Sequence, residues 1–290
     1  KRKRTVMNLE MFKKTVDEYS VDGGGTVSFT PVVGDPLMDK KLIEKVKYAR
    51  SKKNIKSAFM YTNGLFLDNY DFKELVLCGF TRIAISIHFG SRELYKKYFG
   101  VDGYERVLKN IKNLARTNIE FNRPLKITLH MRVEAPKEKW LNNEDFKEIS
   151  ELLDEKDISY KTHYENWSGY ISEKDLPSGC TLGDNPEEKI KHKVPCWELY
   201  RKTYVMSDGD VGTCTSRDME GEIDIGSVED GTLMQLWRGD KLKKFRSNWK
   251  KGILPKVCQT CDRYRSIDNY VKEHKFSVLK TLVFKRIFKL

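Results

Sequence analysis

The stretch TRIAISIHF, residues 81–89, decides the fold class of this chain. Apolar and polar side chains alternate along it, which is the two-residue period of a β-strand with one face against a core. The side chains of its more polar face are Arg82, Ala84, Ser86 and His88. The stretch LKITLHMRV, residues 125–133, repeats the alternation. The sequence therefore predicts strands with one apolar and one polar face.

Helix-period segments separate the strands that we expect in the first half of the chain. Strands are predicted at 26–33, 56–62, 81–89, 125–133 and 158–165, and helices at 9–19, 39–51, 70–77, 104–116 and 143–153. Crossover helices join parallel strands, whereas a half-exposed antiparallel sheet, which also alternates, needs no helices between its strands. We therefore expect an α/β fold: a curved or open parallel barrel whose polar inner face lines a lumen.

A change of composition near residue 168 marks a second unit. Glycine and proline interrupt short apolar runs from there on, and the regular alternation ends. Small loop-rich units have thin cores and commonly need a metal. We expect a barrel domain at 1–167, a cysteine-rich unit at 168–270 and a basic amphipathic helix at 271–290. That last helix would either pack on the barrel or make a peripheral contact with an anionic membrane.

Four of the six cysteines form the arrangement of a metal site. Cys196 and Cys214 flank a predicted hairpin with an Asp-Gly turn, and Cys258 and Cys261 form a CxxC pair. Zinc is one candidate metal, but tetrathiolate zinc usually has two CxxC pairs, which favours iron–sulfur here. Cys78 is predicted to lie in the core, and Cys180 is either a small buried residue or a thiol that contacts substrate.

Composition and charge restrict the class of protein. The chain carries 54 Lys and Arg against 42 Asp and Glu, a net charge of +12, and 39% hydrophobic residues. Most lysines lie on predicted outer helix faces, so the charge does not favour nucleic acid as a partner. Apolar runs long enough to cross a membrane are absent from the sequence. Metal-like cysteine spacing favours a reducing, cytoplasmic setting over a secreted disulfide framework.

The cysteine spacing resembles that of radical SAM enzymes with a C-terminal auxiliary-cluster domain of the twitch or SPASM type. The resemblance implies a partial (β/α)6 TIM-like barrel that lacks its first strand, followed by a small cysteine-rich α+β domain. It also implies that Cys196, Cys214, Cys258 and Cys261 hold one auxiliary 4Fe-4S cluster.

Three short elements at the ends of consecutive predicted strands extend the resemblance. They are Gly34-Asp35-Pro36-Leu37, Thr62-Asn63-Gly64 and Ser86-Ile87-His88. By resemblance, Gly34, Asp35, Asn63, Ser86 and His88 contact S-adenosylmethionine. Asp35 stands where the family has glutamate, and His88 where it has aspartate.

The family's catalytic Cys-x3-Cys-x2-Cys loop has no counterpart in this sequence, in which Cys78 is the first cysteine. The resemblance therefore implies a second, catalytic 4Fe-4S cluster whose ligands lie outside these residues, and it leaves the catalytic residues unknown. We expect a fragment of a longer enzyme that is inactive alone, with a natural pseudoenzyme as the alternative.

The resemblance implies a reaction for the whole protein. Reductive cleavage of S-adenosylmethionine would yield a deoxyadenosyl radical that abstracts hydrogen from a polar small molecule or peptide, with flavodoxin or ferredoxin as electron donor. Residues expected to line the substrate lumen are Ser28, Thr30, Ser86, His88, His130 and Arg132. Two alternatives remain: a noncatalytic, metal-stabilised binding module for RNA or an anionic membrane surface, and an RNA-modifying enzyme.

Overall fold

The computed structural model describes residues 5–134, 136, 138–183 and 194–274, and its largest element is a five-stranded sheet. The strands are β1 (Gly25–Ser28), β2 (Ile55–Thr62), β3 (Arg82–His88), β4 (Lys126–Arg132) and β5 (Ile158–Lys161). They lie in the order β1-β2-β3-β4-β5, and every neighbouring pair is parallel. The predicted α/β fold with a parallel sheet is thereby confirmed.

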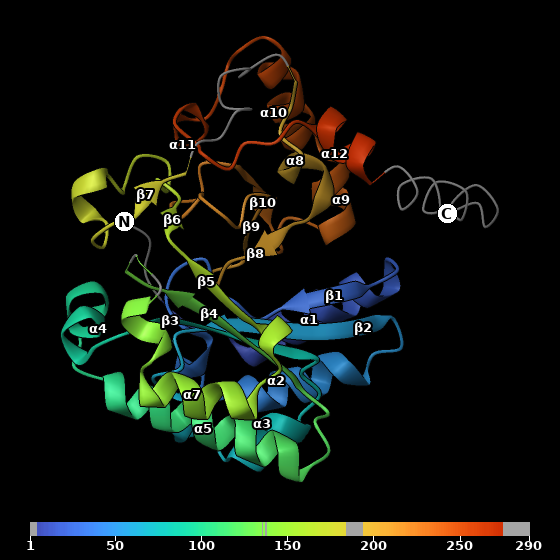
Figure 1. Cartoon of the computed structure of the whole chain (residues 1–290). Coiled ribbons are helices and arrows are strands. Elements are labelled where there is room, and N and C mark those ends of the chain that lie inside the picture. Colours follow the sequence, from blue (N-terminus) through green and yellow to red (C-terminus); the bar gives the residue numbers. More distant parts are fainter. Residues whose placement is uncertain (1–4, 135, 137, 184–193, 275–290) are drawn as a thin grey trace.

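Helices cover one face of this sheet (Figure 1). The helices of this part are α1 (Leu9–Val21), α2 (Leu42–Ser51), α3 (Phe72–Leu77), α4 (Arg92–Phe99), α5 (Tyr104–Glu120), α6 (Glu138–Leu141) and α7 (Glu144–Leu152). The isoleucines of β3, Ile83, Ile85 and Ile87, are fully buried in the core. The alternation in β3 is thus explained by helices on one face and a smaller unit over the other.

Three of the differences between the structure and the predicted elements concern β1, α4 and the last predicted strand. β1 ends at Ser28 instead of 33, shortly before Pro31, which lacks the N–H that a sheet ladder requires. Helix α4 was not predicted, although Ser91 caps its start and Gly100 ends it in the left-handed region at φ 71°. The last predicted strand is split, because β6 (His163–Tyr164) leaves the main sheet and pairs with β7 (Thr181–Leu182).

The second unit is a small antiparallel sheet with short helices. Its strands β8 (Tyr204–Val205), β9 (Asp210–Gly212) and β10 (Asp224–Ser227) lie in the order β10-β9-β8. Its helices are α8 (Glu198–Arg201), α9 (Leu233–Arg238), α10 (Asp240–Lys250), α11 (Lys256–Gln259) and α12 (Ile267–Glu273). The predicted hairpin is confirmed: β8 and β9 are antiparallel, and Gly209 at the turn has φ 95°.

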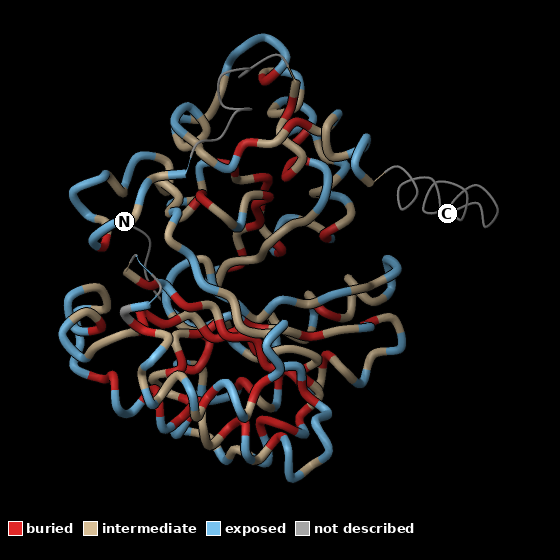
Figure 2. Tube along the Cα trace, viewed as in Figure 1, coloured by how far each residue is buried: buried red, intermediate tan, exposed pale blue. Residues whose placement is uncertain are grey.

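Each unit has its own hydrophobic core, and buried residues gather in both units (Figure 2). Helix α1 contacts both cores. Met11 and Tyr19 on α1 pack against the core of the small unit, while Val16 packs in a cluster with residues of the first. The Lys14 ammonium donates to the Val228 carbonyl at 2.6 Å. Helix α1 therefore holds the small unit on the sheet.

Short 3₁₀ helices occur at Pro36–Met38, Leu67–Asn69, Glu155–Asp157 and Glu173–Asp175. Within the residues that the structure describes, no helix is long and apolar enough to cross a membrane. The predicted basic helix at 271–290 falls almost wholly on residues 275–290, which lie outside the described part; α12 ends at Glu273.

Candidate functional site

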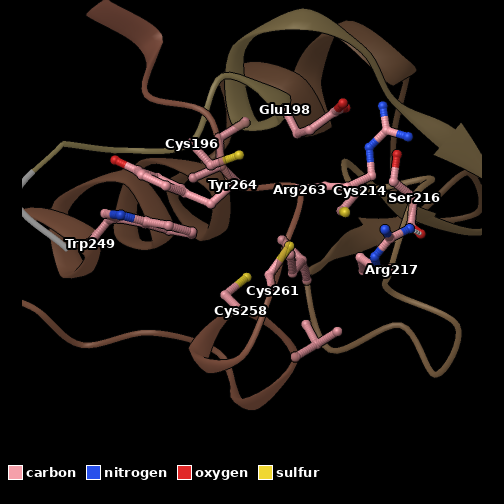
Figure 3. Close-up of a pocket in the computed structure, with 13 residues that line it drawn as sticks. Cys196, Glu198, Cys214, Ser216, Arg217, Trp249, Cys258, Cys261, Arg263 and Tyr264 are labelled. Atoms are coloured by element: carbon pink, nitrogen blue, oxygen red, sulfur yellow. Dashed lines mark hydrogen bonds between the residues drawn. The ribbon is translucent and has the colours of Figure 1, made fainter. Parts of the chain in front are cut away.

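The predicted metal ligands come together in the small unit. Cys196, Cys214, Cys258 and Cys261 line a single cavity, with Trp249 and Tyr264 among its other walls. Figure 3 shows their sulfur atoms around a common space. Three separate segments thus bring four thiols to one place, as the sequence predicted.

Backbone pairing explains why the segments meet. Cys196 forms an isolated antiparallel bridge with Ser266, and the Ile267 N–H donates to the Pro195 carbonyl at 3.0 Å. Cys214 follows β9, whose strand is fixed by the hairpin. In the CxxC turn, the Cys258 N–H donates to the Pro255 carbonyl at 2.9 Å, which starts α11.

Burial makes a negative charge costly at all four thiols. It raises the pKa of Cys196 to about 12, and it also raises the pKa values of Cys214, Cys258 and Cys261. Thiolates are the form that binds metal. A positive centre between these sulfurs would supply the missing compensation, so the donor set fits a metal or an iron–sulfur cluster.

The donor set suits two kinds of metal centre. The four cysteines share one cavity. Four cysteine thiolates hold either one tetrahedral zinc ion or a 4Fe-4S cluster, so the donor atoms alone fit both.

The first two strand-end elements are joined by the carboxylate of Asp35. The Thr62 hydroxyl lies 2.9 Å from each carboxylate oxygen, and the N–H groups of Asn63 and Leu37 donate to the carboxylate at 2.9 and 3.0 Å. Gly34, just before it, is exposed and has φ 103°. A carboxylate has about four acceptor positions, so these three donors leave one for a ligand's ammonium group.

The third element lies at the end of β3. His88 is only 4% exposed, and its ring stacks on Tyr98 with a centroid separation of 4.1 Å. Burial, with a smaller contribution from Arg132, lowers the pKa of His88 to about 3, so the imidazole is neutral. Ser86 is half-buried on the same face.

The predicted lumen residues fall into two groups. Ser86 lies opposite His130, and His88 opposite Arg132, in the β3–β4 register. Ser28 and Thr30 lie in and just beyond β1, two strands from β3, where Thr30 accepts a hydrogen bond from the Tyr61 N–H at 2.8 Å. The structure therefore brings the β3 and β4 residues together and leaves Ser28 and Thr30 apart from them.

Sequence reasoning missed the tyrosines beside His88. The ring of Tyr164, on β6, is nearly parallel to His88 at 6.4 Å between centroids. The hydroxyl oxygens of Tyr98 and Tyr164 are both buried without a hydrogen-bond partner within the described structure. The Ser91 and Gly100 signals that bound α4 could have located Tyr98, whereas nothing local indicates that β6 leaves the sheet.

The remaining cysteines occupy different environments. Cys78 is 4% exposed in the main core, as predicted. Cys180 is half-buried, and its thiol donates to the Val133 carbonyl at 3.1 Å, so it lies beyond the end of β4.

Comparison with known families matches both units. Residues 1–131 match the radical SAM superfamily, and residues 196–262 match SPASM, an iron–sulfur cluster-binding domain. A probable GTP 3',8-cyclase of Saccharolobus islandicus is 39% identical over 80 residues, 28% of this chain and 25% of that protein. A probable GTP 3',8-cyclase of Sulfurisphaera tokodaii is 30% identical over 94 residues, 32% of this chain and 28% of that protein. The match thus spans about a quarter of these relatives.

Two solved structures share the fold. BtrN in complex with AdoMet and 2-DOIA has a TM-score of 0.54 and 19% identity, covering 91% of this chain and 83% of BtrN. Streptococcus suis SuiB bound to the precursor peptide SuiA has a TM-score of 0.57 and 14% identity, covering 91% of this chain and 66% of SuiB. At these identities the likeness concerns the fold alone.

Proposed function

Since the chain combines a radical SAM domain with a SPASM iron–sulfur cluster-binding domain, we propose that it belongs to an enzyme that abstracts hydrogen from a polar substrate. These domains imply S-adenosylmethionine and 4Fe-4S clusters as cofactors. When bound and reduced, such cofactors supply a deoxyadenosyl radical as the hydrogen acceptor. The observation that carries the proposal is the cavity lined by four cysteines within the cluster-binding match.

We propose that the sheet is part of a six-stranded partial barrel and that the chain divides near residue 168. The separate cores of the two units support this division. The same proposal includes the predicted reducing, cytoplasmic setting, in which the cysteines remain thiols. It also includes an electron donor such as flavodoxin or ferredoxin, because the cluster must be reduced.

At the cofactor site, the proposed role of Asp35 is to fix the ends of β1 and β2 and to accept from the cofactor's ammonium group. Its three protein donors support the first part, and its remaining acceptor position supports the second. Gly34, Asn63, Ser86 and His88 remain the other proposed contacts. His88, being neutral, can donate or accept one hydrogen bond without adding charge.

The proposed substrate site is the sheet face beneath the small unit. Arg132 is exposed there beside His88, and Arg82 lies 5.3 Å from the centre of the Tyr61 ring. Guanidinium groups bind carboxylates and phosphates through paired hydrogen bonds. A polar small molecule or a peptide with an acidic group suits this face; SuiB, of similar fold, is bound to a precursor peptide.

The test is anaerobic reconstitution of the natural protein that contains these residues, followed by reduction with dithionite and S-adenosylmethionine. We expect 5'-deoxyadenosine to form and an Asn63→Ala variant to form much less. Asn69→Ala is the matched control, because Asn69 is exposed and its side-chain oxygen accepts a hydrogen bond from Arg106, outside the proposed cofactor contacts. Absence of 5'-deoxyadenosine from the reconstituted, reduced protein would refute the proposed activity.

A further inference from the structure

A buried cation beside the cysteine cavity has no part in the functions described so far. Arg217 lines this cavity together with the four cysteines, yet its side chain is only 3% exposed. Figure 3 shows its guanidinium at the edge of the group of four cysteine side chains. A buried arginine is costly unless it is fully paired, so its partners are informative.

Arg217 is held by two carboxylates from different parts of the chain. Its Nε donates to Asp262 at 3.0 Å, and Asp262 directly follows Cys261. A terminal nitrogen donates to Glu165 at 2.8 Å, on the segment that leaves the main sheet. The other terminal nitrogen donates to the Ser216 carbonyl at 2.7 Å. Arg217 thus ties the cysteine loop to the segment after β6.

The segment after β6 is bent to meet this arginine. Trp167 and Ser168 both have positive φ, at 50° and 58°, a conformation that costs free energy in residues other than glycine. The Trp167 ring lies 4.6 Å from the Arg217 guanidinium, and the Thr260 hydroxyl donates to the Ser168 carbonyl at 2.9 Å. Contacts with the small unit therefore stabilise the strained backbone of Trp167 and Ser168.

The charges of this group balance. Arg263 donates to the second oxygen of Glu165 at 3.0 Å, so two arginines face two carboxylates, Glu165 and Asp262. Loss of one member leaves a net charge next to the cavity. A net negative charge there disfavours adding an electron to a cluster, and a net positive charge favours it.

We propose that Arg217 is a positioning residue that sets the reduction potential of the cluster bound by the four cysteines and fastens the 163–168 segment to the cysteine loop. The proposal rests on the proposed function, since it presumes an iron–sulfur cluster in this cavity. It assigns the segment leaving the substrate-facing sheet a direct electrostatic link to that cluster.

The test measures the midpoint potential of the anaerobically reconstituted chain by dithionite titration followed by electron paramagnetic resonance. Each reduction adds one electron from dithionite to the cluster. Arg217→Met should lower the potential and Glu165→Gln should raise it, each by at least a tenfold change in the reduction equilibrium, about 59 mV. Arg217→Lys, which keeps the charge, should restore most of the potential lost in Arg217→Met.

Lys241→Met is the matched control. It also removes a cation of the small unit, but Lys241 is 60% exposed, pairs with Asp224 and lies outside the cysteine cavity. Opposite shifts in Arg217→Met and Glu165→Gln, with Lys241→Met unchanged, support the proposal, because a purely structural role would not reverse sign.

Potentials that match the control, or that move in the same direction in both variants, overturn it. If Arg217→Met fails to assemble a cluster, Glu165→Gln and Arg217→Lys decide: the first must raise the potential and the second must stay near the wild type. Failure of the wild-type chain itself to take up iron and sulfide would instead refute the proposed cluster, which separates the two failures.

Discussion

The Thr62 hydroxyl lies within 2.9 Å of both carboxylate oxygens of Asp35. This contact joins the loop after β1 to the end of β2, and Thr62 is only 4% exposed. Two motifs that are 27 residues apart therefore act as one structural piece. This Thr62–Asp35 contact, the Asp35 clamp, therefore holds the proposed cofactor contacts Gly34 and Asn63 close to each other.

Replacing Thr62 with valine should loosen this clamp. The change keeps the side chain's shape but removes a hydrogen bond to a partly buried carboxylate, which should cost about 1–3 kcal/mol of unfolding free energy. Urea unfolding measures the loss. Thr26→Val removes a comparable hydroxyl contact, 2.7 Å from Ser57, on the exposed edge strand; it should cost clearly less, and equal losses would argue against the clamp.

His88 should make the protein sensitive to acid. Because burial lowers its folded pKa to about 3, the unfolded state, with a pKa near 6.5, binds the proton first as the pH falls. The stability that the neutral ring contributes is therefore complete above about pH 6.5 and is lost progressively toward pH 3, by at most about 1.4 kcal/mol per pH unit.

A His88→Phe variant checks this contribution by urea unfolding at several pH values. It should retain the ring stack and show a shallower loss of stability between about pH 6 and pH 4. Tyr98→Phe keeps His88, so its unfolding free energy should depend on pH as steeply as that of the wild type. An identical slope in His88→Phe and wild type would show that His88 does not titrate in this way.

Helix α1 should contribute to the docking of the small unit through Glu18. The carboxylate of Glu18 accepts from the Leu233 N–H at 3.0 Å, at the start of α9. Glu18→Met should lower the unfolding free energy by about 1–2 kcal/mol, since it removes a hydrogen bond to a charged group. Glu10→Met is the control, because Glu10 is 83% exposed and, among the described residues, forms an ion pair only with Lys13 on the same helix. Equal effects would refute the contact's contribution.

The parallel sheet could be predicted because its signal is local. The alternation of apolar and polar side chains in residues 81–89 and 125–133 indicates which of them face the helices. The Asp-Gly turn predicts the hairpin between Cys196 and Cys214. The spacing of the cysteines sufficed to predict that they lie together, and in the structure they line one cavity.

The contacts that tune the sites could not be predicted, because they join distant segments. Nothing near Arg217 indicates that Glu165, 52 residues away, is its partner. The stack of His88 on Tyr98 depends on helix α4, and the approach of Tyr164 depends on β6 leaving the main sheet. Such partners are chosen by tertiary packing, which sequence periodicity does not encode.

Counting iron and acid-labile sulfide after anaerobic reconstitution tests the central claim, a 4Fe-4S cluster on the four cysteines, most directly. We predict about four of each per chain at this site in the wild type and in Cys78→Ala, whose cysteine lies in the other core. Cys258→Ala should lose both. Zinc bound without sulfide, or undiminished iron and sulfide in Cys258→Ala, would contradict the account.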